Sequence, residues 1–110
     1  MNTDLTQKKC VPCRGGILPM TVEQAQDLLR VISSWRLEGG KLVRDFGFKN
    51  FKEAIIFINK VGDIAEEEGH HPNIFLHSWN KVTLTLFTHK INGLHQNDFI
   101  LAAKINTIRV

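Results

Sequence analysis

Residues 51–72 read FKEAIIFINKVGDIAEEEGHHP and predict the longest helix of this chain, followed by a sharp stop. Apolar side chains recur there every three or four positions, which is the spacing of one face of an α-helix. The predicted apolar face consists of Phe51, Ala54, Ile55, Ile58, Val61 and Ala65, widened by Phe57 and Ile64. Gly69 suits the left-handed conformation that ends a helix, and Pro72 prevents the helix from resuming. We therefore expect a helix over residues 51–68.

The segment before this helix predicts a shorter helix and then a β-hairpin. Thr21 is a suitable N-cap and Gln24 completes a capping box, so a helix is expected over about 21–33. Residues 35–46 contain two short runs separated by a Gly-Gly pair at 39–40. Tight hairpin turns need positive φ, which glycine supplies without steric cost.

The segment after the long helix predicts two more strands and a final helix. Residues 73–79 and 81–89 are the expected strands, the Asn-Gly pair at 92–93 is a turn, and a helix is expected over about 96–107. The second strand alternates, with Val82, Leu84 and Leu86 on one face and Thr83, Thr85, Phe87 and His89 on the other.

The predicted element order is α-β-β-α-β-β-α, which is typical of an α+β domain. We expect a four-stranded antiparallel sheet with three helices packed on one face. A chain of 110 residues is too short to cover both faces. The uncovered face carries Thr, Phe and His side chains and is expected to be partly wet or to face a ligand.

Length, composition and charge are those of a single soluble domain. The chain is 43% hydrophobic and 23% charged. No stretch approaches the roughly 18 consecutive apolar residues of a membrane span. The formal charge of +3 is spread along the chain, which argues against direct nucleic-acid binding. The N-terminus lacks the basic-then-apolar layout of a signal peptide, so a cytoplasmic location is expected.

A polar N-terminal arm, residues 1–18, precedes the predicted domain over 19–110 and holds both cysteines of the chain, Cys10 and Cys13. A structural zinc site needs four thiolate or imidazole ligands, and no second cysteine pair exists. A thioredoxin-like site needs its pair at a strand-to-helix junction. We interpret the pair as two thiols in a loosely held leader, with a metal held between subunits or a labile disulfide as the alternatives.

Three histidines carry the strongest chemical signal of the sequence. His70 and His71 lie between the long helix and the third strand, and His89 ends the fourth strand. In an antiparallel meander the start of one strand lies near the end of its neighbour, so the three imidazoles are expected in one cleft. Histidine titrates near neutral pH, so one ring can donate a proton while another accepts one.

Two other interpretations of the histidines stay open. A surface histidine is usually only solvated, and neighbours in sequence need not share a site. A zinc site formed by His70, His71 and His89 is disfavoured because adjacent residues rarely face one metal ion, and helical His-x-x-x-His spacing is missing. No metal is therefore expected.

Two carboxylates and one aromatic ring are candidates to support the histidines. Glu66 lies near a helix C-terminus, where a carboxylate is unfavourable against the helix dipole, which hints that it orients an imidazole. Glu67 and Glu68 share this place, so the sequence does not single out Glu66. Asp98 falls in the first turn of the last helix, where acidic residues are favoured in any case. Trp79 is either a half-buried aromatic residue or part of a pocket for a flat heterocycle.

The spacing of these candidates is more specific than any one of them. From Glu66 it runs three residues to His70-His71-Pro72, six to Trp79, nine to His89 and eight to Asp98. This pattern resembles the signature of the pterin-4a-carbinolamine dehydratases, also called dimerisation cofactors of a homeodomain transcription factor.

Other segments extend the resemblance to about residues 19–108. Residues 46–51, FGFKNF, as well as Thr88-His89 and Gly93-Leu94, resemble family positions. One departure is His95, a cap position where family members often carry Thr. The cysteine arm resembles an extension found in some bacterial and plant relatives.

The resemblance implies a hydro-lyase that acts on 4a-hydroxytetrahydrobiopterin in tetrahydropterin recycling. Such an enzyme expels the 4a-hydroxyl as water and removes the N5 proton, giving quinonoid dihydropterin, and it needs no cofactor. The implied roles are proton transfer for His70 and His89, pterin holding mainly for His71, support of the histidines for Glu66 and Asp98, and a pocket wall for Trp79.

The resemblance also implies a homo-oligomer, a dimer or a tetramer built as a dimer of dimers, and a pathway link to aromatic amino-acid hydroxylases. An exposed apolar sheet face agrees with an oligomer. Two alternative functions stay open. One is a non-catalytic dimerisation or coactivator scaffold, and the other is a pterin-related role in molybdenum-cofactor metabolism.

Overall fold

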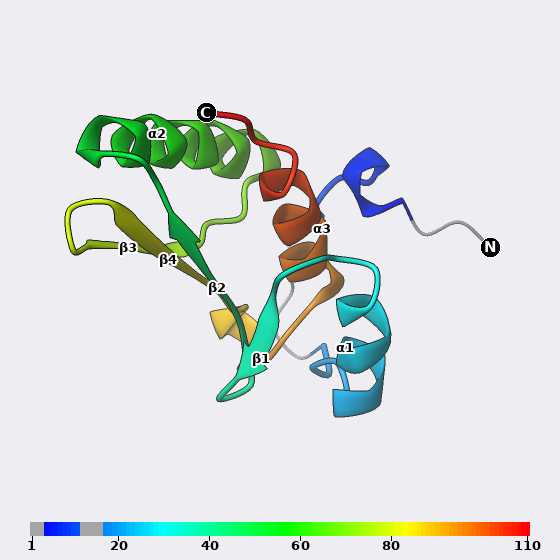
Figure 1. Cartoon of the computed structure of the whole chain (residues 1–110). Helices are drawn as coiled ribbons and strands as arrows, with labels where there is room; N and C mark the ends of the chain where they lie inside the picture. The colour runs from blue at the N-terminus through cyan, green and yellow to red at the C-terminus, as the bar shows by residue number, and fades with distance from the viewer. Residues whose placement is uncertain (1–3, 12–16) are drawn as a thin grey trace.

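The computed structural model describes residues 4–11 and 17–110 of the chain (Figure 1). Its helices and strands follow the predicted order α-β-β-α-β-β-α, preceded by one short 3-10 turn and interrupted by another. The elements are η1 (Leu5–Gln7), α1 (Val22–Leu29), β1 (Arg36–Glu38), β2 (Lys41–Gly47), α2 (Phe51–Glu68), β3 (Asn73–His77), β4 (Lys81–Leu86), η2 (His89–Ile91) and α3 (Gln96–Ile105).

The four strands form one antiparallel sheet in the order β1-β2-β4-β3. Arg44 of β2 pairs with Leu84 of β4, which pairs in turn with Ile74 of β3. The α+β fold class predicted from the sequence is confirmed. Because β3 lies at the edge of the sheet, one side of that strand has no neighbouring strand among the residues that the structure describes.

The last two strands are shorter than predicted. The strand expected over 81–89 ends at Leu86, and His89 instead begins the 3-10 turn η2. The cause is a tight reversal, in which Thr88 forms an isolated bridge with Gly93. The strand expected over 73–79 ends at His77 because the hairpin turn needs left-handed backbone, with φ of 49° and 54° at the next two residues.

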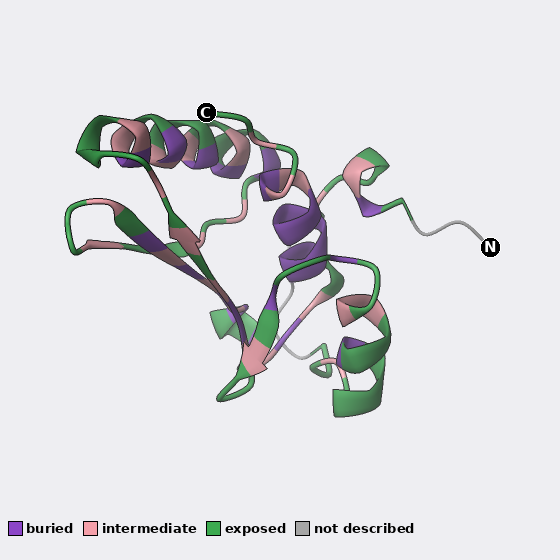
Figure 2. Cartoon of the chain, viewed as in Figure 1, coloured by how far each residue is buried: buried purple, intermediate pink, exposed green. Residues whose placement is uncertain are grey.

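The hydrophobic core lies between the sheet and the helices α2 and α3 (Figures 1 and 2). Helix α3 is buried on nearly all sides, whereas α2 buries one face only. That face is Ala54, Phe57, Val61, Ala65 and Glu68. Phe51 was predicted on the apolar stripe but is 52% exposed. The buried face therefore begins at Ala54, and Phe51 lies about one turn before it, at the first residue of the helix.

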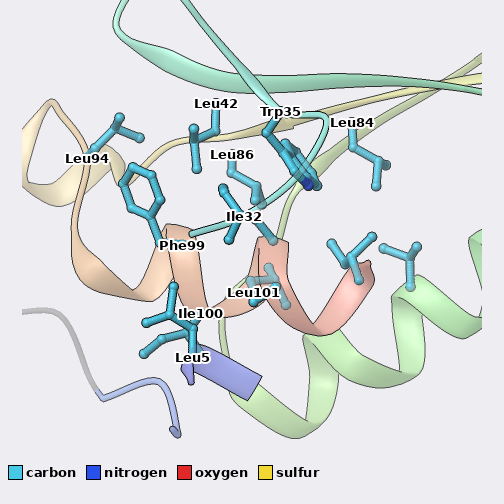
Figure 3. Close-up of a cluster of buried hydrophobic side chains, with 14 of the residues drawn as sticks. Leu5, Ile32, Trp35, Leu42, Leu84, Leu86, Leu94, Phe99, Ile100 and Leu101 are labelled. Carbon is cyan, nitrogen blue, oxygen red and sulfur yellow. The ribbon is translucent and has the colours of Figure 1, made fainter. Parts of the chain in front are cut away.

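The N-terminal arm is not a loose leader where the structure describes it. Leu5 is 1% exposed and belongs to the same core cluster as Ile100 of α3 (Figure 3). The expectation of a loosely held arm is therefore wrong for residues 4–11, because an apolar side chain of η1 fastens them to α3. Cys13 lies outside the described residues.

Candidate active site

The C-terminal end of α2 positions the two adjacent histidines. Gly69 takes the left-handed conformation with φ of 64°, and its N–H donates to the carbonyl of Ala65. The N–H of His70 donates to the same carbonyl at 3.2 Å, which ties the first histidine to the last turn of the helix. The chain then leaves the helix axis, and His71 precedes β3.

His70 is paired with a buried carboxylate. Its Nε2 lies 2.6 Å from Oδ1 of Asp98, and the two side chains are 12% and 0% exposed. The other oxygen of Asp98 accepts from Oγ1 of Thr88 at 2.8 Å and from the N–H of His95 at 3.0 Å. Because both carboxylate oxygens have partners, the Asp98 side chain is fixed in one orientation, facing His70.

The same Asp98 also caps α3, so one residue serves the fold and the site. Asp98 is at the third position of the helix and completes a capping box with His95. Nδ1 of His95 accepts from the N–H of Asn97 at 3.0 Å. The imidazole of His95 therefore takes the place of a Thr hydroxyl at this cap, which matches its interpretation from the sequence.

His71 is paired with an exposed carboxylate. Its Nε2 lies 2.6 Å from Oε2 of Glu66, but the side chains are 59% and 80% exposed. The sequence placed Glu66 one turn before the histidine pair without deciding which ring it meets. The structure assigns Glu66 to His71 and leaves His70 to Asp98.

His89 reaches the same hollow from the other side. It begins η2 just after β4, and its ring meets Phe87 edge-on with 5.1 Å between the ring centroids. A pocket of about 590 Å³ is lined by all three histidines and Glu66, together with residues from the arm, the end of α2 and the start of α3. The structure thus brings His70, His71, His89 and Glu66 to one pocket, with Asp98 directly behind His70.

Another hollow, of about 620 Å³, lies between α1 and the start of α3. His95 is the histidine that lines it, and the Nδ1 of that ring is engaged as a helix cap. The pocket with three histidines is therefore the candidate active site. Among residues 4–11 and 17–110, no group of three or more His, Cys, Asp or Glu side chains is arranged to hold a metal ion.

The structure does not bring Trp79 to this pocket within one chain. Trp79 lies in the turn between β3 and β4, with φ of 54°, and is 62% exposed rather than half-buried. The histidines gather where β3 begins and β4 ends, which is the opposite end of the same hairpin. The signature spacing in sequence therefore suggested a place for Trp79 beside the histidines, whereas the hairpin geometry keeps it away from them within one chain.

Sequence reasoning missed two buried polar side chains beside the pocket, Glu68 and Asn97. The Glu68 carboxylate is 1% exposed, accepts from Lys104 Nζ at 2.6 Å and accepts from the N–H of Cys10 at 2.8 Å. Burial alone would raise the pKa of Glu68, but the hydrogen bonds from Lys104 and Cys10 and the nearby lysine charges outweigh burial and lower it. The sequence could have indicated that Glu68 is buried, because Glu68 follows Val61 and Ala65 at the three- and four-residue spacing of the buried helix face.

The Cys10 thiol lies at this pocket as a neutral group. Its Sγ is 3.6 Å from the carbonyl oxygen of Asn97. Burial, followed by the charge of Glu68, raises the pKa of Cys10 to about 12. A thiol of this kind stays protonated at neutral pH, so in this conformation Cys10 is neither a nucleophile nor a thiolate ligand.

Comparison with known proteins identifies similar sequences. The family model for pterin 4 alpha carbinolamine dehydratase matches residues 18–108. A putative pterin-4-alpha-carbinolamine dehydratase of Methylococcus capsulatus is 50% identical over 94% of this chain and 92% of its own length. The mitochondrial pterin-4-alpha-carbinolamine dehydratase 2 of Arabidopsis thaliana is 48% identical over 97% of this chain and 60% of its own length.

Two solved structures share the fold. A transcriptional coactivator/pterin dehydratase from Brucella melitensis matches with a TM-score of 0.75 and 32% identity over 80% of this chain and 95% of that one. A pterin dehydratase-like protein described as a RuBisCO assembly factor in the alpha-carboxysome matches with a TM-score of 0.57 and 26% identity, over 66% of this chain and 86% of that one. In the part of the chain that the structure describes, no helix has the length and apolar character needed to cross a membrane.

Proposed function

This chain belongs to the pterin 4 alpha carbinolamine dehydratase family, and on that premise we propose that it converts 4a-hydroxytetrahydrobiopterin to quinonoid dihydropterin and water by histidine acid–base catalysis. The observation that carries the proposal is one pocket lined by three histidines, two of which lie 2.6 Å from a carboxylate. A protein that only assembles other proteins has no need of such an arrangement.

The chemistry of the reaction asks for one acid and one base. Hydroxide is a poor leaving group, so the acid protonates the 4a-oxygen and the C–O bond breaks with release of water. The base removes the N5 proton, and the electron pair of the N–H bond forms the new C=N bond. One proton is taken up and one is released, so the step needs no oxidant or reductant, and each proton-transfer group contributes on the order of 10²–10⁴ in rate.

We assign proton transfer to His70 and His89. A carboxylate only accepts hydrogen bonds, so Nε2 of His70 carries a hydrogen and donates to Asp98. Proton transfer to or from the substrate would then run through Nδ1 of that ring. Asp98 fixes the tautomer and orientation of His70 in the way that a buried aspartate does in a catalytic triad. His89 lines the other side of the pocket and supplies the second group.

We assign His71 mainly to holding the pterin. Its pairing with Glu66 directs the Nε2 hydrogen to the carboxylate, and both groups remain largely in water. An exposed pair of this kind can adjust to a ligand at little cost. The pocket volume of about 590 Å³ lies within the usual range for a small-molecule site.

The direct test is the loss of the carbinolamine's ultraviolet absorbance in the presence of purified protein. We expect the wild-type protein to accelerate this loss and the triple variant His70→Ala, His71→Ala, His89→Ala to return the rate to the uncatalysed value. His77→Ala is the matched control, because His77 bonds to Thr83 Oγ1 on the sheet and does not line the pocket. An unchanged rate in the triple variant would contradict the proposal.

We also propose that the chain forms a homo-oligomer, either a dimer or a tetramer. The edge strand β3 carries Phe75, which is 62% exposed, and Ile74, which is 39% exposed. An apolar edge strand with a free side is a surface on which a second strand can pair. Light scattering should give a multiple of the 12.5 kDa chain mass, and Phe75→Glu should lower it. A monomeric wild-type protein would contradict this proposal. Trp79 does not reach the pocket of its own chain, so in a monomer it could not line a histidine pocket at all.

The physiological setting is a proposal of its own. We favour tetrahydropterin recycling in the cytoplasm, in the service of an aromatic amino-acid hydroxylase. A pterin-related role in molybdenum-cofactor metabolism and a dimerisation or coactivator scaffold are the alternatives, and the second agrees with the descriptions of the two related structures. A hydroxylase encoded nearby would favour recycling, whereas molybdopterin genes would not.

A further inference from the structure

The N-terminal arm borders the pocket that holds the three histidines. Cys10 and Val11 line that pocket, although they lie outside residues 18–108, the part that matches the family model. The arm is fastened at its beginning by Leu5 in the core.

Asn97 holds the arm by a reciprocal pair of hydrogen bonds. The N–H of Val11 donates to Oδ1 of Asn97 at 3.0 Å, and Nδ2 of Asn97 donates to the carbonyl of Val11 at 2.6 Å. Asn97 is 2% exposed and is the residue before Asp98. The Asn97 side chain bonds to the backbone N–H and carbonyl of Val11 and not to a side chain of the arm. Asn97 therefore fixes the path of the arm's backbone.

Glu68 holds the arm at the preceding residue. Its Oε1 accepts from the N–H of Cys10 at 2.8 Å, while its Oε2 accepts from Lys104. Glu68 lies two residues before His70, as Asn97 lies one residue before Asp98. The two side chains that fasten the arm therefore belong to the same short segments that carry the His70–Asp98 pair.

We propose that Cys10 and Val11 form one wall of the substrate pocket, and that Asn97 and Glu68 are positioning residues that hold this wall in place for the reduced pterin. The inference rests on the proposed function. It deepens that function by adding a substrate-binding segment outside the matched family region. Without the arm, the Asn97 amide and one oxygen of Glu68 would lose their partners, and a carboxylate would open towards the ligand.

The wall acts on substrate binding and not on the proton transfers. The thiol of Cys10 stays protonated at neutral pH, and Val11 has no titratable group, so neither replaces a histidine. An interaction made equally with substrate and transition state changes KM and leaves kcat unchanged.

The test compares two asparagines at opposite ends of α3. We expect Asn97→Ala to raise KM for the carbinolamine by about tenfold, the factor that corresponds to about 1.4 kcal/mol, with kcat within about twofold. Asn106→Ala is the matched control, because Asn106 is bonded to Trp35 and Ser33, away from the pocket. It should lower stability without raising KM. An unchanged KM in Asn97→Ala, or a fall in kcat alone, would overturn the inference.

A second measurement uses the native wall and does not depend on the folding of a pocket variant. In Cys13→Ser protein, Cys10 is the remaining cysteine, and its alkylation by iodoacetamide can be followed by mass spectrometry. Iodoacetamide reacts with the thiolate, and Cys10 is neutral while the arm is docked, so alkylation reports the fraction of molecules in which the arm has left the pocket. The stable pterin 7,8-dihydrobiopterin, at ten times the concentration that half-inhibits turnover, should slow alkylation by up to about tenfold, because a bound pterin keeps the arm docked. If the pterin inhibits turnover but leaves the alkylation rate unchanged, the inference that Cys10 and Val11 form a wall of the substrate pocket is overturned. If the wild-type protein shows no turnover, the proposed function is overturned instead.

Discussion

The inner and outer sides of the histidine pocket each hold one imidazole against one carboxylate, at the same distance of 2.6 Å. On the inner side, His70 and Asp98 are 12% and 0% exposed, and Asp98 has two further donors. On the outer side, His71 and Glu66 are 59% and 80% exposed. The contact distance is therefore a poor guide to what each pair contributes.

Solvent makes the difference between the two pairs. Charges in water are screened strongly, and an exposed ion pair loses part of its attraction to the entropy of two mobile side chains. A buried carboxylate cannot exchange its partners for water, so Asp98 imposes one tautomer and one orientation on His70. The comparison shows a fixed imidazole on the inner side and an adjustable one on the outer side, which supports the proposed division into proton transfer and binding.

The largest effect is expected from Asp98→Asn. An amide cannot accept at both of its ends, so either His70 or the donors Thr88 and His95 lose an acceptor. We expect kcat to fall on the order of 10²–10⁴-fold, as for a triad aspartate. The measurement is the rate of carbinolamine loss, with circular dichroism as the check that the protein is folded. If Asp98→Asn is folded and keeps the wild-type kcat, the buried His70–Asp98 pair does not contribute to proton transfer as proposed.

An intermediate effect, on stability, is expected from Glu68→Gln. Glu68 and Glu66 lie two residues apart, yet the first is buried with Lys104 and the second is exposed. We expect a loss of about 1–3 kcal/mol in the free energy of unfolding for Glu68→Gln, from denaturant titration at pH 7. Glu66→Gln is the matched control and should change this energy little. Equal losses in the two variants would show that burial does not separate these carboxylates.

The effect of Glu68→Gln should depend on pH in a definite direction. The folded-state pKa of Glu68 is lowered, so its carboxylate contributes stability above the unfolded-state value of 4.5. That contribution is lost as the pH falls through the lower, folded-state pKa. The difference between wild type and Glu68→Gln should therefore be largest near neutral pH and shrink below pH 4.5. A difference that grows in acid would contradict this assignment.

The smallest effect on catalysis is expected from Glu66→Gln. Its pair with His71 is exposed, so we expect KM to rise by less than about tenfold and kcat to change little. Salt offers a further check, because the Debye length falls from about 10 Å at 0.1 M to about 3 Å at 1 M. The difference in KM between wild type and Glu66→Gln should shrink in high salt, whereas the loss caused by Asp98→Asn should persist.

Local patterns in the sequence predicted most of the fold. The long helix, the Gly69 stop and the strand alternation follow from periodicity and capping, and these depend on near neighbours alone. The meeting of His70, His71 and His89 in one pocket also followed from strand order. The first three rest on near neighbours, and the meeting of the histidines rests on the pairing of two strands that follow each other in the sequence.

The pairing of side chains could not be predicted in the same way. Which carboxylate meets which imidazole depends on how α2 and α3 pack, and Asp98 has a sufficient local reason to be acidic as part of a helix cap. The docking of the arm depends on Asn97, which no sequence pattern connects to Val11. For Trp79 the sequence predicted a contact that is not formed. The signature spacing suggested that Trp79 lies beside the histidines, but the β3–β4 hairpin keeps them at opposite ends within one chain.

The most direct test of the account is the separation of kcat from KM in His70→Ala and His71→Ala, measured with the carbinolamine as substrate and with His77→Ala as control. We predict that His70→Ala loses kcat by about 100-fold or more, while His71→Ala mainly raises KM. The control should match the wild-type protein in both constants. Equal losses of kcat in the His70 and His71 variants, or wild-type kcat in His70→Ala, would contradict the division between a fixed inner group and an adjustable outer one.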